Sequence, residues 1–406
     1  MSVITYNKDG IPVINGIIEI KKNFRDQLYT SNGYNYDEVI SAVQKCIRRG
    51  LVNDALFWAK EIYDMGRPFR SNLINRLKII ASEDIGIANS IFVHMLKSRL
   101  DEPISERSIM GIVKAACLSP KSRLCSSIIH AVMDPKPKNY PKKLERFKYK
   151  IYKRKQLFPG KRSDTDRFKA CMNSFTHALR KKDEKSACYW AQKVFEIKNY
   201  NKSARKKFEG KSKDPIYGLW IVLLNEKLRG LLRDSYQIIR SLLYFFDDRK
   251  NGRVERVFLV HAILYLCNLP NTRESMWNII SDDHQSYFDI NDELWGVIQE
   301  HKMIPMLTDA IDNHTRRGRE RRNGSKHFCE TDTKLVNVPD FLKTDPYLEV
   351  ARGLNMQRDN EKMKPRIRKL NKKIKPKRRR EDENNKKKKK KKVKKLKLIN
   401  GKFIFV

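Results

Sequence analysis

Several features that would assign this chain to a common class are missing from its 406 residues. The seven cysteines are an odd number and form no CxxC pair, which excludes a zinc ribbon and a disulfide framework and favours a reducing intracellular compartment. The first ten residues, MSVITYNKDG, lack the pattern of a signal peptide, and no apolar run approaches the roughly 20 residues that span a bilayer. We therefore expect a soluble intracellular protein with no membrane partner.

Motifs for nucleotide binding and catalysis are also missing. No G-x-x-x-x-G-K-[ST] phosphate loop occurs, and the Gly160-Lys161 pair lacks both the first glycine and a preceding strand. The eight histidines do not pair at metal-ligand spacing, and no arrangement of a nucleophile with a base stands out. We predict a protein that is not an enzyme and that uses no cofactor and no metal.

Basic residues, by contrast, are in large excess. The chain has 87 Lys and Arg against 47 Asp and Glu, a net charge of +40. Residues 361–406 hold 23 of the basic and four of the acidic residues, so they carry +19 of that charge, and +21 lies on residues 1–360. This balance excludes an ordinary neutral enzyme as the default and favours a polyanionic partner, most often nucleic acid.

The spacing of apolar residues predicts an all-α architecture for most of the body. From Tyr36 onward Val39, Val43 and Ile47 recur at helical spacing, and a second helix follows the break at Gly50. Short polar or Gly/Pro breaks separate the further helices that we expect. These lie at about 68–82, 86–99, 105–118, 121–133, 165–182, 184–198, 215–230, 233–247, 252–268 and 272–281.

The second helical block repeats the first. ALFWA at residues 55–59 aligns with ACYWA at 187–191, and ACLSPKSR at 116–123 aligns with LCNLPNTR at 266–273. Two copies of one helical unit explain both matches, and convergent patterning of helical cores is the alternative. Trp58 and Trp190, at equivalent positions of the two copies, are interpreted as core anchors.

These patterns divide the chain into six segments. The fold class that we expect is all-α, with two collar-like multi-helix repeats, small β segments at the termini and a disordered basic tail. The segments are an N-terminal β segment (1–35), a first repeat (36–134), a basic linker (135–163), a second repeat (164–282), a mixed basic region (283–356) and a Lys-rich disordered tail (357–406).

Four motifs in the first repeat resemble one known family. They are SAVQKCIRRG (41–50), NDALFWA (53–59), IIASEDIGIA (79–88) and LSPKS (118–122). In this order they resemble the C-terminal helical domain of the RarA/MgsA group of clamp-loader-like AAA+ ATPases, which includes the Werner-helicase-interacting ATPase. HTRRGR (314–319) followed by HFCE (327–330) is similar to a segment near the C-terminus of some related proteins.

The resemblance implies a collar-type helical domain that oligomerises and works at replication forks or recombination intermediates. Members of that family place a motor domain before the collar, whereas only about 35 residues precede Tyr36 here. The sequence is thus similar to a collar without its ATPase domain. A replication ATPase or helicase is then a candidate partner, as is a second copy of this chain.

Three basic segments are the candidate nucleic-acid contacts. The linker interleaves 12 Lys and Arg with aromatic side chains, a combination that neutralises phosphates and offers rings to unpaired bases, although a solvated linker fits as well. A basic turn near residue 318 and the tail complete the set; the turn fits a surface loop too, and the tail also fits a nuclear localisation signal. The candidates are Lys148, Lys150, Lys153, Arg154, Lys155, Arg316, Arg317, Arg319, Arg321, Arg322, Lys377, Arg378, Arg379 and Arg380.

Glu83 and Asp84 are the candidate partner interface. In this interpretation the two carboxylates bind a basic helix across an oligomer interface. The simpler alternative is a helix junction in which Ser82 or Asp84 caps exposed backbone amides.

The function that we expect is that of a non-enzymatic, DNA-associated scaffold in replication, recombination or repair. Its repeats would oligomerise or dock a replication ATPase, and its basic segments would bind duplex or single-stranded DNA. The alternatives are a structural nucleoid or genome-packaging protein, possibly viral, and an RNA-binding factor. The expected location is the nucleus or a cytoplasmic viral DNA replication compartment.

Overall fold

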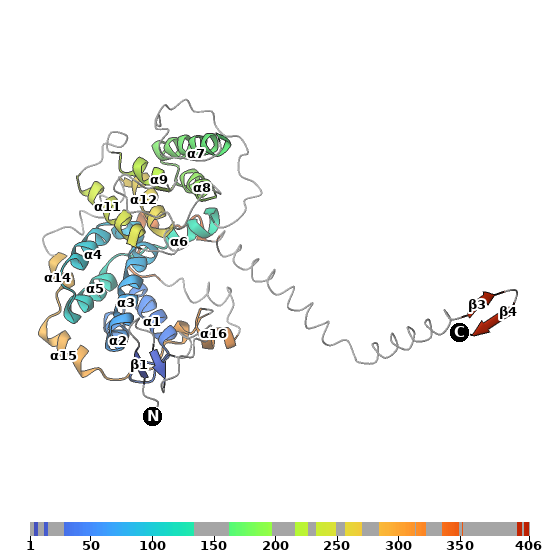
Figure 1. The fold of residues 1–406 in the computed structure, drawn as a ribbon. Coiled ribbons are helices and arrows are strands. Elements are labelled where there is room, and N and C mark those ends of the chain that lie inside the picture. Colours follow the sequence, from blue (N-terminus) through green and yellow to red (C-terminus); the bar gives the residue numbers. More distant parts are fainter. Residues whose placement is uncertain are drawn as a thin grey trace. The chain divides into compact units, whose positions relative to one another are not determined.

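The computed structural model divides the chain into two units, Met1–Asn355 and Met356–Val406. It describes residues 4–6, 12–14, 28–133, 162–196, 216–225, 233–248, 256–269, 284–312, 314–321, 335–348, 351, 396–399 and 402–405. The larger unit is mostly helical (Figure 1). In the smaller unit the structure describes one β-hairpin, in which β3 (Leu396–Ile399) pairs antiparallel with β4 (Lys402–Phe405).

The first helical block runs from residue 36 to residue 133. Its elements are α1 (Tyr36–Arg48), α2 (Val52–Asp64), α3 (Arg67–Ile80), the π-helical turn η2 (Ala81–Ile85), the 3-10 turn η3 (Gly86–Asn89), α4 (Ile91–Asp101), α5 (Glu106–Leu118), α6 (Leu124–Ile128) and the π-helical turn η4 (Ile129–Met133). A short hairpin of β1 (Ile4–Tyr6) and β2 (Pro12–Ile14) precedes it.

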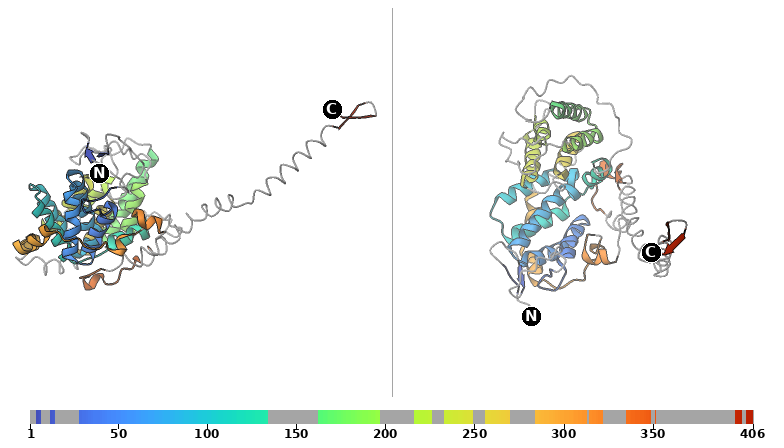
Figure 2. Two further views of the ribbon diagram at one scale, coloured as in Figure 1. Left: turned by 90° about the horizontal axis from the view of Figure 1, so that it is seen from below. Right: turned by 45° about the vertical axis from the view of Figure 1, so that its right-hand side comes forward.

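The second block contains α7 (Arg162–Arg180), α8 (Glu184–Phe195), α9 (Ile216–Leu223), α11 (Arg233–Asp248) and α12 (Arg256–Cys267). The elements that follow are α14 (His284–Phe288), α15 (Asp292–Glu300), η7 (Thr308–Ala310), α16 (Arg316–Glu320) and η8 (Asp340–Leu342). Figures 1 and 2 show the α1–α2 and α7–α8 hairpins at opposite ends of the helical body, with α4, α11 and α12 between them.

Local sequence explains where the helices start and stop. Gly50 ends the first helix of the α1–α2 hairpin with a φ of +68°, a left-handed conformation that glycine adopts without strain. Ser105 caps α5 in a reciprocal pair with Ser108, and Asp183 caps α8 by accepting the amide of Ser186 at 3.0 Å. Most helices that the apolar spacing predicts are therefore confirmed within a few residues.

Several segments depart from the expected helices. The helix expected at 121–133 is α6 followed by a π-helical turn, and the helix expected at 215–230 ends at Leu223. The helix expected at 272–281 lies outside the described residues. The helix predicted from residue 86 begins only at Ile91, because residues 81–89 form a π-helical and then a 3-10 turn. The basic turn expected near residue 318 is the short helix α16, whose first turn is capped by Thr315. Trp58 is fully buried, as expected of a core anchor, whereas Trp190 is only partly buried.

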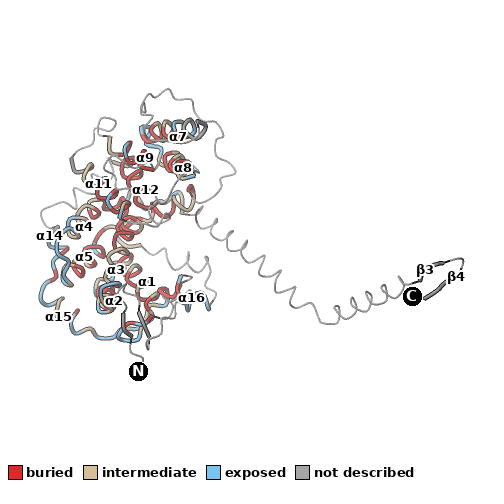
Figure 3. The backbone as a smooth tube through the Cα atoms, in the orientation of Figure 1, coloured by how far each residue is buried: buried red, intermediate tan, exposed pale blue. Residues whose placement is uncertain are grey.

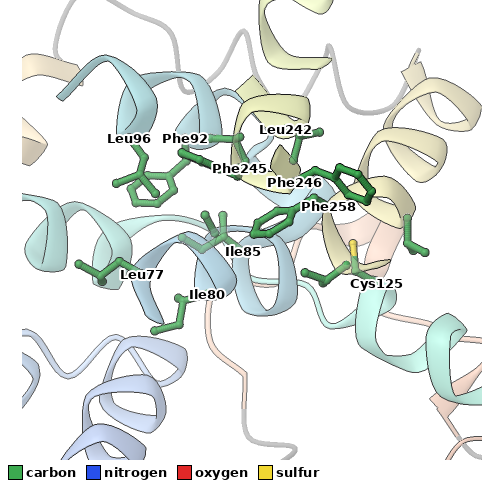
Figure 4. Packing of buried hydrophobic residues seen from close by; sticks show 14 of the residues in the cluster. Leu77, Ile80, Ile85, Phe92, Leu96, Cys125, Leu242, Phe245, Phe246 and Phe258 are labelled. Carbon is green, nitrogen blue, oxygen red and sulfur yellow. The ribbon is translucent and has the colours of Figure 1, made fainter. Parts of the chain in front are cut away.

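A single hydrophobic core joins the two helical blocks. The buried cluster extends from Leu28 to Ala310, and α12 lies at its centre with every residue from Val257 to Cys267 buried (Figure 3). Figure 4 shows Phe245 of α11 and Phe258 of α12, whose ring centroids are 5.9 Å apart, gathered near Phe92 of α4. The two predicted repeats thus pack as one body, and their descent from one unit stays a prediction.

A buried histidine joins α12 to the junction between α3 and α4. The His261 ring is fully buried, with Nδ1 3.0 Å from the Ser82 hydroxyl and Nε2 3.0 Å from the Ser90 hydroxyl. Burial lowers the pKa of His261 from 6.5 to about 3, so the ring is neutral in the folded protein. A neutral ring has one donor and one acceptor, which matches two hydroxyl partners.

This pKa predicts a specific loss of stability in acid. Between pH 6.5 and pH 3 the unfolded chain binds a proton at residue 261 that the folded chain does not, so the free energy of unfolding falls as the pH falls through this window. His261→Gln keeps a donor and an acceptor but does not titrate. We expect it to remove the part of the acid destabilisation that comes from residue 261. The measurement is urea unfolding of both proteins from pH 7 to pH 4; parallel stability curves would contradict the assignment.

Glycine at position 111 permits the close packing of α5 on α14. A Cβ atom there would collide with the backbone carbonyl of Phe288, whereas one at Gly296 of α15 would meet nothing within 4 Å. We expect Gly111→Ala to lower the free energy of unfolding by roughly 1–3 kcal/mol through overpacking. The matched control, Gly296→Ala, should leave it unchanged or raise it by up to about 1 kcal/mol. Equal effects in chemical denaturation would contradict this packing.

Candidate functional site

Two polar stripes face a common cleft from neighbouring helices. On α1 the lining residues recur at intervals of three and four, and on α3 they do the same. The α1 stripe is Asp37, Ile40, Ser41, Gln44, Lys45 and Arg48, and the α3 stripe is Asn72, Asn75, Arg76 and Ile79. Helix faces that turn toward a neighbour are normally apolar, so this polarity marks the cleft as different from the core.

The cleft has a volume of about 640 Å³, within the range of small-molecule sites. Besides the two stripes, it is lined by Tyr36, by Glu83 of η2, by His130 of η4 and by residues from the segment around α16. That segment contributes Asp312, His314 and Arg319, which lie more than 260 residues from α1 in the sequence. We call this site the α1–α3 cleft.

Asp84 anchors the floor of the cleft from beneath. Its side chain is fully buried. Its Oδ1 accepts a hydrogen bond from Nε–H of Arg48 at 2.8 Å, and its Oδ2 accepts one from the side-chain amide of Gln44 at 2.7 Å. Its backbone carbonyl accepts the amide of Ser122 at 2.8 Å. The π-helical turn that carries Asp84 is of a kind often found at functional sites, and here it directs a carboxylate toward α1.

A second ion pair fixes the other end of the floor. Lys45 Nζ lies 2.8 Å from Asp312 Oδ2, and both side chains are 4% exposed. Lys45 also donates to the Asp309 carbonyl, and Arg49 pairs with the Asp309 carboxylate. Burial lowers the pKa of Lys45, although Asp312 opposes that shift, so the ammonium is held in a partly desolvated place.

Arg76 stands on the α3 side of the cleft. Its Nη1 donates to the side-chain oxygen of Gln44 at 3.3 Å, and the Gln44 amide donates in turn to Asp84. A chain of side chains therefore runs from Arg76 through Gln44 and Asp84 to Arg48. Because the partner of Arg76 in this chain is a neutral amide, the contact fixes the guanidinium without neutralising it.

Two of the three acidic residues of the cleft lie in ion pairs. Asp312 pairs with Lys45, and Glu83 lies 3.7 Å from Arg123, which is outside the lining. Asp37 accepts the backbone amide of Arg316 at 2.5 Å. Two of the negative charges are thus paired with cations, and Arg76 lines the cleft with the neutral Gln44 amide as its hydrogen-bond partner.

The arginines predicted around position 318 take different places. Arg317 forms a two-point ion pair with the buried Glu38, with Nε 2.5 Å from Oε1, and this hydrogen bond raises the pKa of Arg317. Arg316 pairs with Glu320 at 3.0 Å, Arg319 lines the cleft, and Arg321 is exposed. Arg317 therefore anchors α16 on α1, and the two helices lie near each other in Figure 1.

The other predicted nucleic-acid contacts lie outside the described residues. They are Lys148, Lys150, Lys153, Arg154, Lys155, Arg322, Lys377, Arg378, Arg379 and Arg380. The linker that holds the first five, and most of the tail that holds the last four, lie outside as well.

The predicted partner interface at Glu83 and Asp84 needs correction. Asp84 has no exposed surface and its carboxylate is bound inside the protein, so it offers nothing to a partner. The alternative is right that these residues form a junction, because 81–89 connect α3 to α4. The Asp84 carboxylate accepts from side chains of α1, however, and the Ser82 hydroxyl contacts His261, so the capping part of that alternative is not what the structure shows. The side chain of Glu83 is 26% exposed and lines the cleft.

Sequence reasoning missed Gln44, Lys45, Arg48, Asn72, Asn75 and Arg76. A signal was present, because the polar residues of both helices recur at three- and four-residue intervals on one face. The partners that fix Lys45 come from residues 309–312, however, and nothing in the sequence pattern joins those positions.

The described part of the chain holds neither an exposed cysteine nor a helix that could cross a membrane. The cysteines there are free and buried, and burial raises the pKa of the Cys117 thiol to about 12 and that of Cys171 to about 11. No group of three or more His, Cys, Asp and Glu in those residues could hold a metal ion. None of the described helices combines the length and the apolarity needed to cross a bilayer.

Comparison with protein-family models, with curated proteins and with solved structures yields no match for this chain. The resemblance to the RarA/MgsA collar domain therefore rests on the four sequence motifs alone. In the structure those motifs lie in α1, α2, the α3–η2–η3 junction and the residues that follow α5.

The buried ion pair at the floor makes a stability prediction. Asp84→Asn leaves the buried Arg48 guanidinium without its carboxylate, and we expect the free energy of unfolding to fall by roughly 3–5 kcal/mol. The control is Asp64→Asn, which removes an exposed pair with Lys60 and should cost less than about 1 kcal/mol. Guanidinium chloride unfolding measures both, and equal losses would contradict the anchoring role of Asp84.

Proposed function

We propose that this protein is a non-enzymatic, DNA-associated scaffold that acts in DNA replication, recombination or repair. The observation that carries the proposal is the distribution of charge. Residues 361–406 carry +19, and the segment 135–163 adds 12 Lys and Arg against a single Glu. Basic segments of this density bind phosphate backbones through counterion release, with little dependence on base sequence.

The helical body supplies the rigid part of the scaffold. Its motifs resemble the collar domain of RarA/MgsA-type ATPases, which supports self-association or docking of a replication ATPase or helicase as its role. The basic segments would then hold duplex or single-stranded DNA next to that assembly. The nucleus, or a cytoplasmic viral DNA replication compartment, is the location that suits this role.

Two other functions use the same charges. A nucleoid or genome-packaging protein would have to be stoichiometric with DNA in the cell, whereas a replication factor need not be. An RNA-binding factor would prefer RNA in direct competition with DNA of the same length. Quantification of the protein per genome, together with competition between matched RNA and DNA strands, distinguishes the three.

The scaffold proposal predicts a steep dependence of DNA affinity on salt. We expect binding of a generic duplex to weaken strongly between 50 and 200 mM salt. Replacing Lys377, Arg378, Arg379 and Arg380 together by Gln should reduce the slope of log K against log salt by up to about 0.9 for each lost phosphate contact. Fluorescence anisotropy with a labelled duplex measures both quantities.

A matched control removes charge elsewhere on the full chain. Lys302 and Lys343 are 79% and 68% exposed, and they pair with the nearby surface residues Glu300 and Asp340. Their joint replacement by Gln should leave the slope unchanged. Affinity that is insensitive to salt in the parent protein would refute the proposal. If the tail variant and the Lys302/Lys343 control have equal slopes, residues 377–380 do not contact DNA.

A further inference from the structure

We propose that the α1–α3 cleft is a binding site for a phosphate group. The inference goes beyond the proposed function, because it assigns a ligand to the folded body and can be tested without DNA. It starts from four basic side chains that converge on one cavity of about 640 Å³, namely Lys45, Arg48, Arg76 and Arg319. Each comes from α1, α3 or α16, so the site exists only in the folded protein.

The floor of the cleft is organised in advance of any ligand. Arg48 and Lys45 are 3% and 4% exposed, and the buried carboxylates of Asp84 and Asp312 set their positions. Groups fixed in this way lose little conformational entropy when a ligand binds.

Arg76 is the group that best fits direct contact with the ligand. It lines the cleft and donates to the neutral Gln44 oxygen at 3.3 Å. A guanidinium presents five N–H donors, so a single contact with an amide leaves it able to bind a phosphate in two-point geometry. The amides of Asn72 and Asn75 lie on the same face of α3 and add neutral donors for phosphate oxygens.

The cleft accommodates an anion better than a cation. Of its three acidic residues, Asp312 and Glu83 pair with the cations of Lys45 and Arg123, and Asp37 accepts the backbone amide of Arg316. Four of the lining residues are Lys or Arg. Desolvation lowers the pKa of Lys45 and of Arg49 beside it, and an anion placed nearby would relieve that penalty. A phosphate ester matches both the charge and the fork-shaped donors of arginine.

Thermal unfolding of the full chain in potassium phosphate, against potassium chloride at equal ionic strength, tests this site. A ligand that binds only the folded state raises Tm with its concentration, whereas phosphate that binds the folded and unfolded chains equally does not. We expect phosphate to raise the Tm of the parent protein. Arg76→Ala should weaken the apparent affinity about tenfold, the effect of losing one charge-assisted contact of about 1.4 kcal/mol.

Three further variants make the result specific. Arg67→Ala removes the same charge from an exposed position at the start of the same helix and should respond to phosphate as the parent does. Arg76→Lys keeps the charge and should retain part of the rise in Tm with phosphate. Arg76→Gln keeps a donor without the charge and should lose that rise as Arg76→Ala does. Unfolding of each variant without phosphate verifies that it folds.

Two sources of the phosphate are distinguished by a second titration. If Arg76→Ala also weakens binding of a 5′-phosphorylated oligonucleotide relative to its unphosphorylated form, the site takes nucleic acid. If it weakens only inorganic phosphate and a free nucleotide, the site takes a small phosphate compound. Equal phosphate responses of Arg76→Ala and Arg67→Ala, or none in the parent protein, would overturn the inference. If the protein does not bind DNA but phosphate still raises its Tm through Arg76, the scaffold proposal is refuted and the phosphate site is not.

Discussion

The ion pair between Asp84 and Arg48 is the constraint around which the first helical block is arranged. It joins the π-helical turn after α3 to the last turn of α1, and the Asp84 carbonyl holds the segment after α5 through Ser122. Taking two charges out of water is costly, and the cost is recovered only when every lone pair has a partner. Gln44 supplies the remaining donor, which explains why a polar stripe begins on α1 at this point.

From this pair the polar character extends outward to the cleft. Arg76 reaches the pair through Gln44, and the second ion pair, between Lys45 and Asp312, attaches the segment before α16 to the same face of α1. Glu38 and Arg317 form a further ion pair about two turns nearer the start of α1. The α1 surface is thus a series of carboxylate–cation contacts, whereas α12 is buried along its length from Val257 to Cys267, mostly among apolar side chains. The cleft lies where these two kinds of packing separate.

Much of the helical framework followed from local rules. The apolar spacing located α5 and α11 within a residue or two, and Gly50 marked the turn of the first hairpin, because helix periodicity and left-handed turns depend on neighbouring residues alone. The π-helical turn at residues 81–85 was not predictable in this way. It interrupts a sequence of ordinary helical pattern, and the burial of Asp84 stabilises it.

The sequence by itself determined the helical class of the body and the excess of positive charge, since both follow from composition and from periodicity over a few turns. It also supplied the polar residues of α1 and α3. Only the tertiary structure decided their use: it buried Asp84, which looked like a surface residue, and committed Arg317 to Glu38. It also placed Asp312 beside Lys45, although the two are 267 residues apart in the sequence. Long-range contacts of this kind depend on how helices pack, and no local pattern encodes them.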